Sequence, residues 1–527
     1  MTQVVADSET LAQAAAALFA DLAQQAVALR GTFSVALSGG TTPGAMFRLL
    51  GAEPYRSQLP WQKIHLFWAD ERSVPPGDPG SNYRLAHDTL IARVPLPSRN
   101  VHRIHGEANP EDAARTYQQE LRAFFGSPQP RFDLVLLGMG QDGHTASLFP
   151  GAATLEEARQ SAVPATADYD GRPSQRVTLT LPALNGARNV VFLVSGKSKA
   201  DALARVWSGE RLPAGLIQPS AGRLTWLVDA TAARAERVIF DCDNTLGLRH
   251  KEIDDGLALL YLLGRSDIAL LGVTTTFGNG SVDEAYTQTR SLVDQLGRQD
   301  VPVLNGEGRR GQGPTEAARF LVKQAAAYPG EITLLATGPL GNLRAAAELD
   351  PNFFVNLKHI VSMGGYFYPL RIGRRDLPEL NLSSDPEAAW TVLNSGCPTT
   401  MMNAHICLQA PFGWRDLWHI RHWGRGMRRV VTQWLLVWAY YFGLPKFYLW
   451  DLVPAVYLSY PELFDENPVH VSSSVGDLEM GTLVANHQAG GTLINLPERI
   501  LEVDRFRQVL FETWRRVDAR AVHGVGS

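Results

Sequence analysis

Short apolar runs alternate with helical patterns along this chain, and that alternation is the feature that most constrains its fold. In the first half the apolar runs are bounded by glycine or polar residues, as is typical of parallel strands covered on both faces. These predicted strands are residues 33–37, 64–68, 132–137 and 189–194. Helical patterns at 110–124 and 197–207 lie between them. The order predicts βαβ units in a doubly wound α/β sheet.

The same alternation restarts after about residue 234, and 527 residues are too many for one hydrophobic core. A short Ala-rich joint at 229–236 separates the two halves. We therefore predict two doubly wound, mostly parallel-sheet (Rossmann-like) α/β domains in tandem, residues 1–233 and 234–527. The strands and the helix that mark the second domain are 237–240, 268–274, 332–336, 359–363 and the helix 255–263.

Charge and cysteine content exclude several classes of protein. A formal net charge of -4 with scattered basic residues argues against a nucleic-acid-binding surface. Three cysteines without C-x-x-C spacing do not make a disulfide framework or a structural zinc site, and they favour a reducing compartment. We expect a cytoplasmic protein that acts on small molecules.

Two apolar stretches need a separate interpretation. Residues 11–29 lack the basic start of a signal peptide, and their spacing predicts an amphipathic helix capped by Ser8. Residues 430–444 are shorter than the roughly 20 residues that span a bilayer. Because this stretch is rich in Trp and Tyr, we predict a buried helix and no membrane partner.

Three motifs of the first half follow predicted strands, at the sheet edge where α/β proteins bind ligands. The glycine turn Ser38-Gly39-Gly40 precedes a helix and offers backbone N–H groups to an anion. Residues 70–72 (Asp-Glu-Arg) precede 81–83 (Ser-Asn-Tyr). The turn 138–150 contains His144 two residues after Asp142, an arrangement suited to a general base oriented by a carboxylate. Taken singly, each motif also has a purely structural interpretation, such as an ion pair for Arg72.

Together these motifs resemble the 6-phosphogluconolactonase family over nearly all of residues 1–232. The resemblance continues through 176–182, 196–200 and 227–229. It implies hydrolysis of 6-phosphogluconolactone to 6-phosphogluconate in the pentose phosphate pathway, without a cofactor. His144 would take a proton from water while Asp142 holds the imidazole tautomer. The expected phosphate ligands are the N–H groups around Ser38, Gly39 and Gly40 and the side chains of Arg72, Arg176 and Lys199. The alternative is an aminosugar-phosphate isomerase or deaminase, a related group with a similar DGH turn.

Carboxylates dominate the second half. Asp241 and Asp243 end a predicted strand, and Asp254 and Asp255 open a helix. Four converging aspartates are costly unless a cation neutralises them, and carboxylate oxygens suit Ca²⁺ or Mg²⁺. Acidic capping of a helix N-terminus would explain the second pair but not the first.

Residues 237–500 resemble the inosine–uridine-type nucleoside hydrolases. The resemblance rests on the aspartates and on segments 273–279, 336–343, 363–365, 379–381, 385–389 and 461–464. It implies Ca²⁺-dependent hydrolysis of the N-glycosidic bond of ribonucleosides, and a homo-oligomer, since that family commonly self-associates. The implied metal ligands are Asp243, Asp255, Asp451 and the carbonyl of Thr337. Asp254 would activate water. The implied ribose contacts are Asp254, Asn279, Glu379 and Asn381.

This half departs from the family pattern at three places. The loop 244–253 is longer than usual, and Gly373 stands where an Asn is expected. Trp450 occupies the position of a His that often serves as the acid for the leaving base. An indole does not supply a catalytic proton but can stack on a base; His250 is the candidate substitute. The alternative for this half is a non-catalytic Ca²⁺/ribose-binding module, and the non-enzymatic alternative for the whole chain is a scaffold protein.

Overall fold

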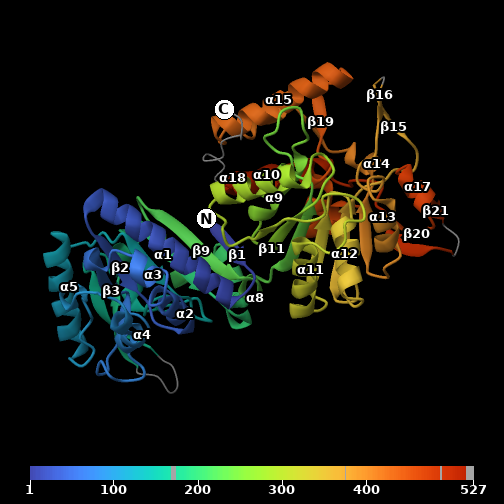
Figure 1. Cartoon of the computed structure of the whole chain (residues 1–527). Helices are drawn as coiled ribbons and strands as arrows, with labels where there is room; N and C mark the ends of the chain where they lie inside the picture. Colours follow the sequence, from blue (N-terminus) through green and yellow to red (C-terminus); the bar gives the residue numbers. More distant parts are fainter. Residues whose placement is uncertain (168–173, 374, 487–489, 518–527) are drawn as a thin grey trace. The chain divides into compact units, whose positions relative to one another are not determined.

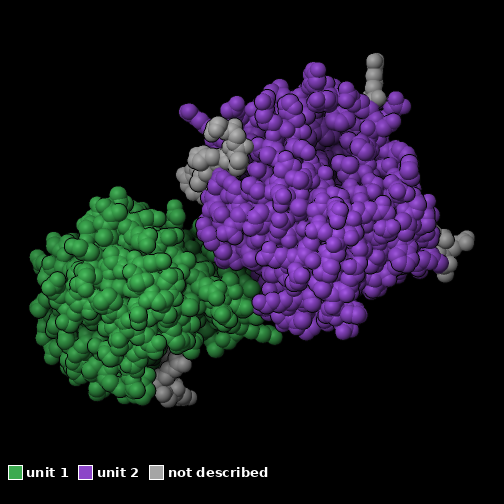
Figure 2. Space-filling model, viewed as in Figure 1, with its two compact units in different colours: residues 1–235 green, residues 236–527 purple. Residues whose placement is uncertain are grey.

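The computed structural model describes residues 1–167, 174–373, 375–486 and 490–517. The chain divides into two compact units, Met1–Ala235 and Glu236–Ser527, which are coloured separately in Figure 2. Each unit has its own hydrophobic core. Among the described residues, no helix combines the length and apolar character needed to cross a bilayer.

Unit 1 is built on a six-stranded sheet of order β1-β9-β8-β5-β2-β3, in which every pairing is parallel. Strands β2 and β5 are buried at every position because helices cover both faces. The sheet strands are β1 (Thr2–Val5), β2 (Phe33–Leu37), β3 (Ile64–Trp68), β5 (Leu134–Leu137), β8 (Asn189–Val194) and β9 (Arg223–Asp229). The helices are α1 (Ser8–Arg30), α2 (Thr41–Leu50), α3 (Tyr55–Gln58), α4 (Asn82–Thr89), α5 (Pro110–Phe125), α6 (Leu181–Asn185), α7 (Ala200–Trp207) and α8 (Ala230–Ala233).

A second, antiparallel sheet of unit 1 lies next to the functional motifs. Its order is β4-β7-β6, with β4 at Asp70–Arg72, β7 at Gln175–Leu179 and β6 at Ala162–Thr166. The register places Arg72 directly opposite Arg176. Two motifs that are about a hundred residues apart in the sequence are thereby joined.

Helix α1 begins one residue earlier than its predicted cap requires. The N-cap is Asp7, whose carboxylate accepts a hydrogen bond from the Thr10 N–H at 2.9 Å, so Ser8 is the first helical residue. The prediction of a Ser8 cap is wrong because the extended backbone of Asp7 brings the carboxylate within reach of the free N–H groups of the first turn.

Unit 2 contains a nine-stranded sheet of order β12-β11-β10-β13-β14-β17-β22-β20-β21. Its pairings are parallel from β12 to β22 and antiparallel from β22 to β21. The strands are β10 (Glu236–Cys242), β11 (Ile268–Thr275), β12 (Val303–Leu304), β13 (Ile332–Ala336), β14 (Leu357–Met363), β17 (Thr399–Met402), β20 (Pro468–Val471), β21 (Ala485–Asn486) and β22 (Thr492–Asn495). The predicted fold class, two mostly parallel α/β sheets in tandem, is confirmed.

Helices α11, α12 and α13 lie side by side against this sheet (Figure 1), while α9 packs against α16 and α18. Two short ribbons, β15 (Leu370–Ile372) with β16 (Arg375–Leu377) and β18 (Pro411–Gly413) with β19 (Lys446–Tyr448), lie outside it. The helices are α9 (Asp254–Leu263), α10 (Val282–Gln295), α11 (Glu316–Ala327), α12 (Gly341–Leu349), α13 (Pro386–Leu393), α14 (Ala404–Cys407), α15 (Arg425–Phe442), α16 (Leu452–Ser459), α17 (Val475–Glu479) and α18 (Val503–Arg516).

Helix α15 is not the buried helix that its composition predicts. One stripe, Met427, Val431, Leu435 and Trp438, faces the core. Other large side chains stay accessible, and Tyr440 is 83 % exposed. The prediction failed because aromatic content does not distinguish one buried stripe from burial all round.

Candidate active sites

The turn after β5 presents a His–Asp pair. His144 Nδ1 lies 2.5 Å from Asp142 Oδ1, and the His144 N–H donates to the same oxygen at 3.2 Å. An ionised carboxylate only accepts, so Nδ1 carries the hydrogen and Nε2 is left as the proton acceptor. Burial lowers the pKa of His144 below its usual value, against the opposing effect of the Asp142 charge. The imidazole is thus a neutral base near pH 7.

Gly140 makes this pair sterically feasible. A Cβ atom at position 140 would lie 2.0 Å from His144 Nδ1 and 2.6 Å from Asp142 Oδ1. The backbone closes the turn, because Gly140 N–H donates to the His144 carbonyl at 2.8 Å. The sequence shows the glycine but not its proximity to the imidazole.

A buried polar cluster, Asp70, Asn82 and Ser147, stands at the start of β4 and was missed as a functional group at the level of the sequence. Ser147 Oγ donates to Asp70 Oδ2 at 2.7 Å, and Asn82 Nδ2 donates to the Asp70 carbonyl at 2.8 Å. Gly39 fits against it, since a Cβ there would lie 1.9 Å from Asn82 Oδ1. Asp70, Asn82 and Ser147 belong to the sequence motifs 70–72, 81–83 and 138–150, but no sequence pattern showed that these three motifs contact one another.

The predicted cations converge on the same region. Arg176, 3 % exposed, lies 4.0 Å from Asp70 Oδ2, and its guanidinium lies 5.9 Å from the Phe149 ring. Phe149 also packs on His144, with ring centroids 4.8 Å apart. Lys199, in a 3-10 turn before α7, acts electrostatically on His144. Arg72 Nη1 donates to the Gly80 carbonyl at 2.5 Å.

The turn Ser38-Gly39-Gly40 both stabilises the fold and begins helix α2. Ser38 Oγ donates to the Leu136 carbonyl at 2.8 Å, so its hydroxyl is used within the fold. Gly40, with φ of +113°, is the N-cap of α2, and no side chain caps that helix. The first-turn N–H groups of α2 therefore fit the predicted role of anion donors.

In unit 2 the carboxylates of Asp254, Asp255 and Asp451 each offer an oxygen within 4.8 Å of the others. Asp254 and Asp255 start α9, and Asp451 is the N-cap of α16. Burial, followed by mutual repulsion, raises the pKa of Asp255 and Asp451 well above the usual range, and burial raises that of Asp254 to about 7. The structure brings these three predicted residues together.

Asp243 and Thr337 complete the cluster. Asp243 Oδ2 accepts a hydrogen bond from the Asn279 N–H at 2.5 Å, and burial raises the pKa of Asp243 to about 6. Thr337 Oγ1 donates to Asp255 Oδ1 at 2.6 Å, and its carbonyl accepts from Asn381 Nδ2 at 2.9 Å.

The residues present fit a hard divalent cation. The donors are all oxygen atoms, and each of the four carboxylates is almost fully buried. Asp254 Oδ1 is buried and has no hydrogen-bond partner among the described residues. Repelling, incompletely bonded carboxylates are the arrangement that a cation stabilises.

Asp241 belongs to a different group from the other aspartates. It accepts hydrogen bonds from Thr274 Oγ1 at 2.5 Å and from Asn342 Nδ2 at 2.8 Å. Asp241 lies within β10 and Asp243 directly follows it, and of these two aspartates Asp243 joins the cluster.

A cavity of about 120 Å³ adjoins the carboxylates. Glu379 lines it, and its carboxylate accepts hydrogen bonds from the backbone N–H groups of Gly365, Asn381, Leu382 and Ser383. Every residue named from the sequence as a ribose contact lines this cavity: Asp254, Asn279, Glu379 and Asn381.

The rest of the cavity wall includes aromatic rings and one more carboxylate. Trp438 and Trp450 both line it, as does Glu252, which was not predicted as a site residue. Gly373, with φ of +61°, directly follows β15 and does not line the cavity. His250, the candidate substitute acid, is exposed and is not among the described residues that line the cavity.

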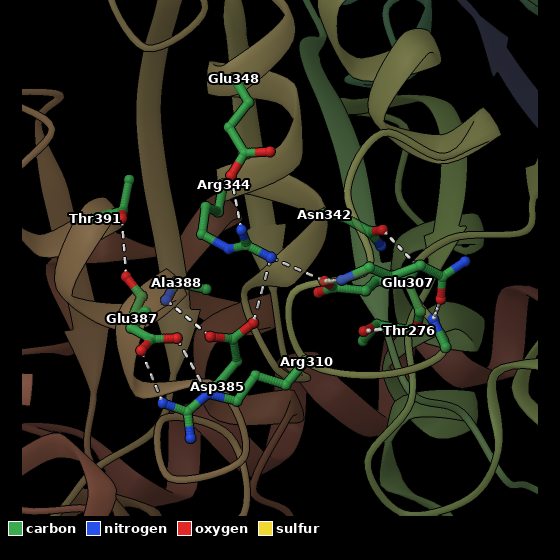
Figure 3. Close-up of polar contacts among 12 residues, drawn as sticks. Thr276, Glu307, Arg310, Asn342, Arg344, Glu348, Asp385, Glu387, Ala388 and Thr391 are labelled. Carbon is green, nitrogen blue, oxygen red and sulfur yellow. Dashed lines mark hydrogen bonds and ion pairs between the residues drawn. The ribbon is translucent and has the colours of Figure 1, made fainter.

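Arg344 of α12 joins the segments that carry Glu307 and Asp385 (Figure 3). Arg344 Nη2 lies 2.9 Å from Glu307 Oε1 and 3.7 Å from Asp385 Oδ2, and both carboxylates are fully buried. Glu307 N–H donates to Asn342 Oδ1 at 2.8 Å, which links the network to Asp241. Asp385 is the N-cap of α13, directly after the Glu379–Asn381 segment. One guanidinium thus compensates two buried charges next to the site.

Comparisons with known proteins assign the two units separately. Residues 6–226 match the family described as glucosamine-6-phosphate isomerases/6-phosphogluconolactonase, and residues 238–508 match the inosine-uridine preferring nucleoside hydrolases. The 6-phosphogluconolactonase of Synechocystis is 44 % identical over 216 residues, 40 % of this chain and 86 % of that protein. The human 6-phosphogluconolactonase is 40 % identical over 252 residues, 47 % of this chain and 97 % of that protein.

Among solved structures, a plant nucleoside hydrolase is 22 % identical with a TM-score of 0.48, over 53 % of this chain and 98 % of that one. The sequence matches decide the assignment: the chain belongs to the glucosamine-6-phosphate isomerase/6-phosphogluconolactonase family through unit 1 and to the inosine-uridine preferring nucleoside hydrolase family through unit 2.

Proposed function

We propose that the chain is a bifunctional hydrolase, a 6-phosphogluconolactonase in unit 1 and a Ca²⁺-dependent ribonucleoside hydrolase in unit 2. The observation that carries the first activity is the His144–Asp142 pair, an imidazole held by a carboxylate at 2.5 Å, beside Arg176 and Lys199. The observation that carries the second is the buried carboxylate cluster next to a cavity lined by all the expected ribose contacts.

In the lactonase step, His144 Nε2 takes a proton from a water molecule as its oxygen bonds to the lactone carbonyl carbon. The ester C–O bond then breaks, and the ring oxygen takes the proton back from the His144 imidazolium, which gives the open acid and restores the neutral base. Asp142 stabilises the imidazolium that forms. Arg72, Arg176, Lys199 and the N-terminus of α2 hold the phosphate, and such positioning supplies a large part of the rate.

The test for unit 1 compares two substrates. We expect the full chain to hydrolyse 6-phosphogluconolactone above its spontaneous rate and to leave glucosamine 6-phosphate unchanged. His144→Ala should lower the lactone rate by about 10²–10⁴. Turnover of glucosamine 6-phosphate instead of the lactone would favour the isomerase alternative.

In unit 2, Asp243, Asp255, Asp451 and the Thr337 carbonyl would hold the cation, which supplies charge stabilisation and lowers the pKa of bound water when present. Asp254 accepts the proton of the attacking water, because one of its oxygens is not hydrogen-bonded. Glu379 and Asn381 orient the ribose, and the anionic cluster stabilises the positive charge that develops as the N-glycosidic bond breaks. Trp438 and Trp450 provide faces for the base.

The test for unit 2 is a nucleoside panel assayed with and without a chelator. We expect release of a base from at least one ribonucleoside, lost with chelator and restored by Ca²⁺. Ca²⁺ binding without turnover of any ribonucleoside would favour the non-catalytic module. Asp254→Asn removes the proposed proton acceptor and should therefore abolish the turnover of a ribonucleoside that the parent chain hydrolyses.

A further inference from the structure

A second, larger cavity of unit 2 lies between the loop 247–251 and α15, with a volume of about 310 Å³. Figure 1 shows this loop rising from the end of β10 towards α15. The loop is the extra length that the sequence shows before the aspartate pair. A volume near 300 Å³ is at the lower end of that of small-molecule sites.

Helix α15 presents a second apolar stripe to this cavity. Val430, Trp434, Val437 and Tyr441 are spaced four, three and four residues apart, so they share one face of the helix. This face differs from the core stripe that ends at Trp438. Trp434 and Tyr441 give the cavity aromatic surfaces against which a flat ring can stack.

The facing wall is basic. Arg249, His250 and Lys251 line it, and none of the described lining residues is acidic. Lys251 Nζ donates to the Asn279 carbonyl at 2.6 Å, which anchors the loop. Within the described part of the chain, the side chains of Arg249 and His250 form no ion pair or hydrogen bond, and both are exposed. The Arg249 guanidinium and the His250 imidazole at the rim of this aromatic-lined cavity offer N–H donors to an anion.

The cavity is separate from the nucleoside site but shares walls with it. Glu252 lines the nucleoside site, while its chain neighbours Lys251 and Ile253 line the second cavity. On α15, Trp438 lines the nucleoside site and its chain neighbour Val437 lines the second cavity.

From this combination we propose that the cavity is a second ligand site, which binds a flat aromatic anion of the nucleotide class. The ring lies against Trp434 and Tyr441, and the phosphate is held by Arg249 and His250. This binding does not depend on hydrolysis in the neighbouring site.

The experiment measures binding of adenosine 5′-monophosphate to the full chain in chelator by equilibrium dialysis, with adenosine and inorganic phosphate as matched probes. We expect the nucleotide to bind more tightly than either fragment and to weaken with added salt. The double variant Arg249→Ala/His250→Ala should weaken nucleotide binding about fivefold. Trp434→Ala should weaken it at least about fivefold as well, the size of one lost stacking contact.

Arg429→Ala is the control, because Arg429 is an exposed cation of α15 that does not line the cavity, and it should leave binding unchanged. Equal binding of adenosine and its monophosphate, or indifference to the Arg249/His250 variant, overturns the proposal. Loss of nucleotide binding in Glu379→Gln but not in the Arg249/His250 variant also overturns it, because the nucleotide then occupies the ribose site. Nucleotide binding in a chain that hydrolyses no nucleoside would support this site while refuting the activity proposed for unit 2.

Discussion

Replacing Gly140 with alanine tests whether the His144–Asp142 geometry drives lactone hydrolysis. The new Cβ would lie 2.0 Å from His144 Nδ1, whereas real Cβ contacts essentially never fall below 3.0 Å. The imidazole must therefore move by about 1 Å, from 3.0 minus 2.0, and Asp142 Oδ1, at 2.6 Å, must move too. A misplacement of this size costs roughly 10²-fold in rate. Since φ of Gly140 is not positive, the backbone itself accepts alanine.

The assay is enzymatic opening of 6-phosphogluconolactone near neutral pH, with thermal melts of the same preparations. Gly138→Ala is a matched control in the same turn, because its Cβ would meet no atom within 4 Å. We expect Gly138→Ala to retain its rate and Gly140→Ala to lose it while melting like the parent chain. Wild-type turnover in Gly140→Ala would refute His144 as the base.

Three further predictions concern charge. Because burial lowers the pKa of His144, kcat/KM for the lactone should reach half its plateau below pH 6.5. Asp142→Asn removes a charge that raises this pKa and should move the midpoint to lower pH. A midpoint above pH 6.5 in the parent chain contradicts this. Asp255→Asn should weaken Ca²⁺ binding in calorimetric titration and abolish a Ca²⁺-dependent stabilisation of roughly 2.7 kcal/mol at 100 times Kd; melts indifferent to chelator in the parent chain count against the metal site. Arg344→Met should destabilise unit 2 by about 3–5 kcal/mol in urea unfolding, and Glu307→Gln in that background should recover part of the loss. The control Arg310→Met breaks an exposed ion pair with Glu387 and should cost less than about 1 kcal/mol. Equal losses in Arg344→Met and Arg310→Met would contradict a special role for the buried pair.

The fold was predictable because both halves rely on local periodicity. Strands β2, β3, β8 and β13 coincide with the apolar runs expected from the sequence, since a strand buried on both faces requires such a run. The orientation of α15 was not predictable, because the second apolar stripe faces a loop instead of the core.

The candidate sites were predictable where a motif is contiguous. His144 with Asp142 and Asp254 with Asp255 are close in sequence, and the chain itself brings them together. The contacts of Asp70 with Ser147, and of Arg344 with Glu307, join residues that lie far apart in the sequence. No periodicity or motif encodes such contacts, so they appear only once the sheet order is known.

The facing pair Arg72 and Arg176 in the β4–β7 ribbon links the stability of unit 1 to ligand binding. Like charges directly opposite each other on adjacent strands oppose their pairing, and Asp70 Oδ2 lies 4.0 Å from the Arg176 guanidinium. A sugar phosphate bound between them would remove that repulsion, so ligand binding and folding of the ribbon are thermodynamically linked. Unit 1 should therefore resist heat and proteolysis better when its phosphorylated substrate is plentiful, so that carbon supply itself helps to set how much folded enzyme persists.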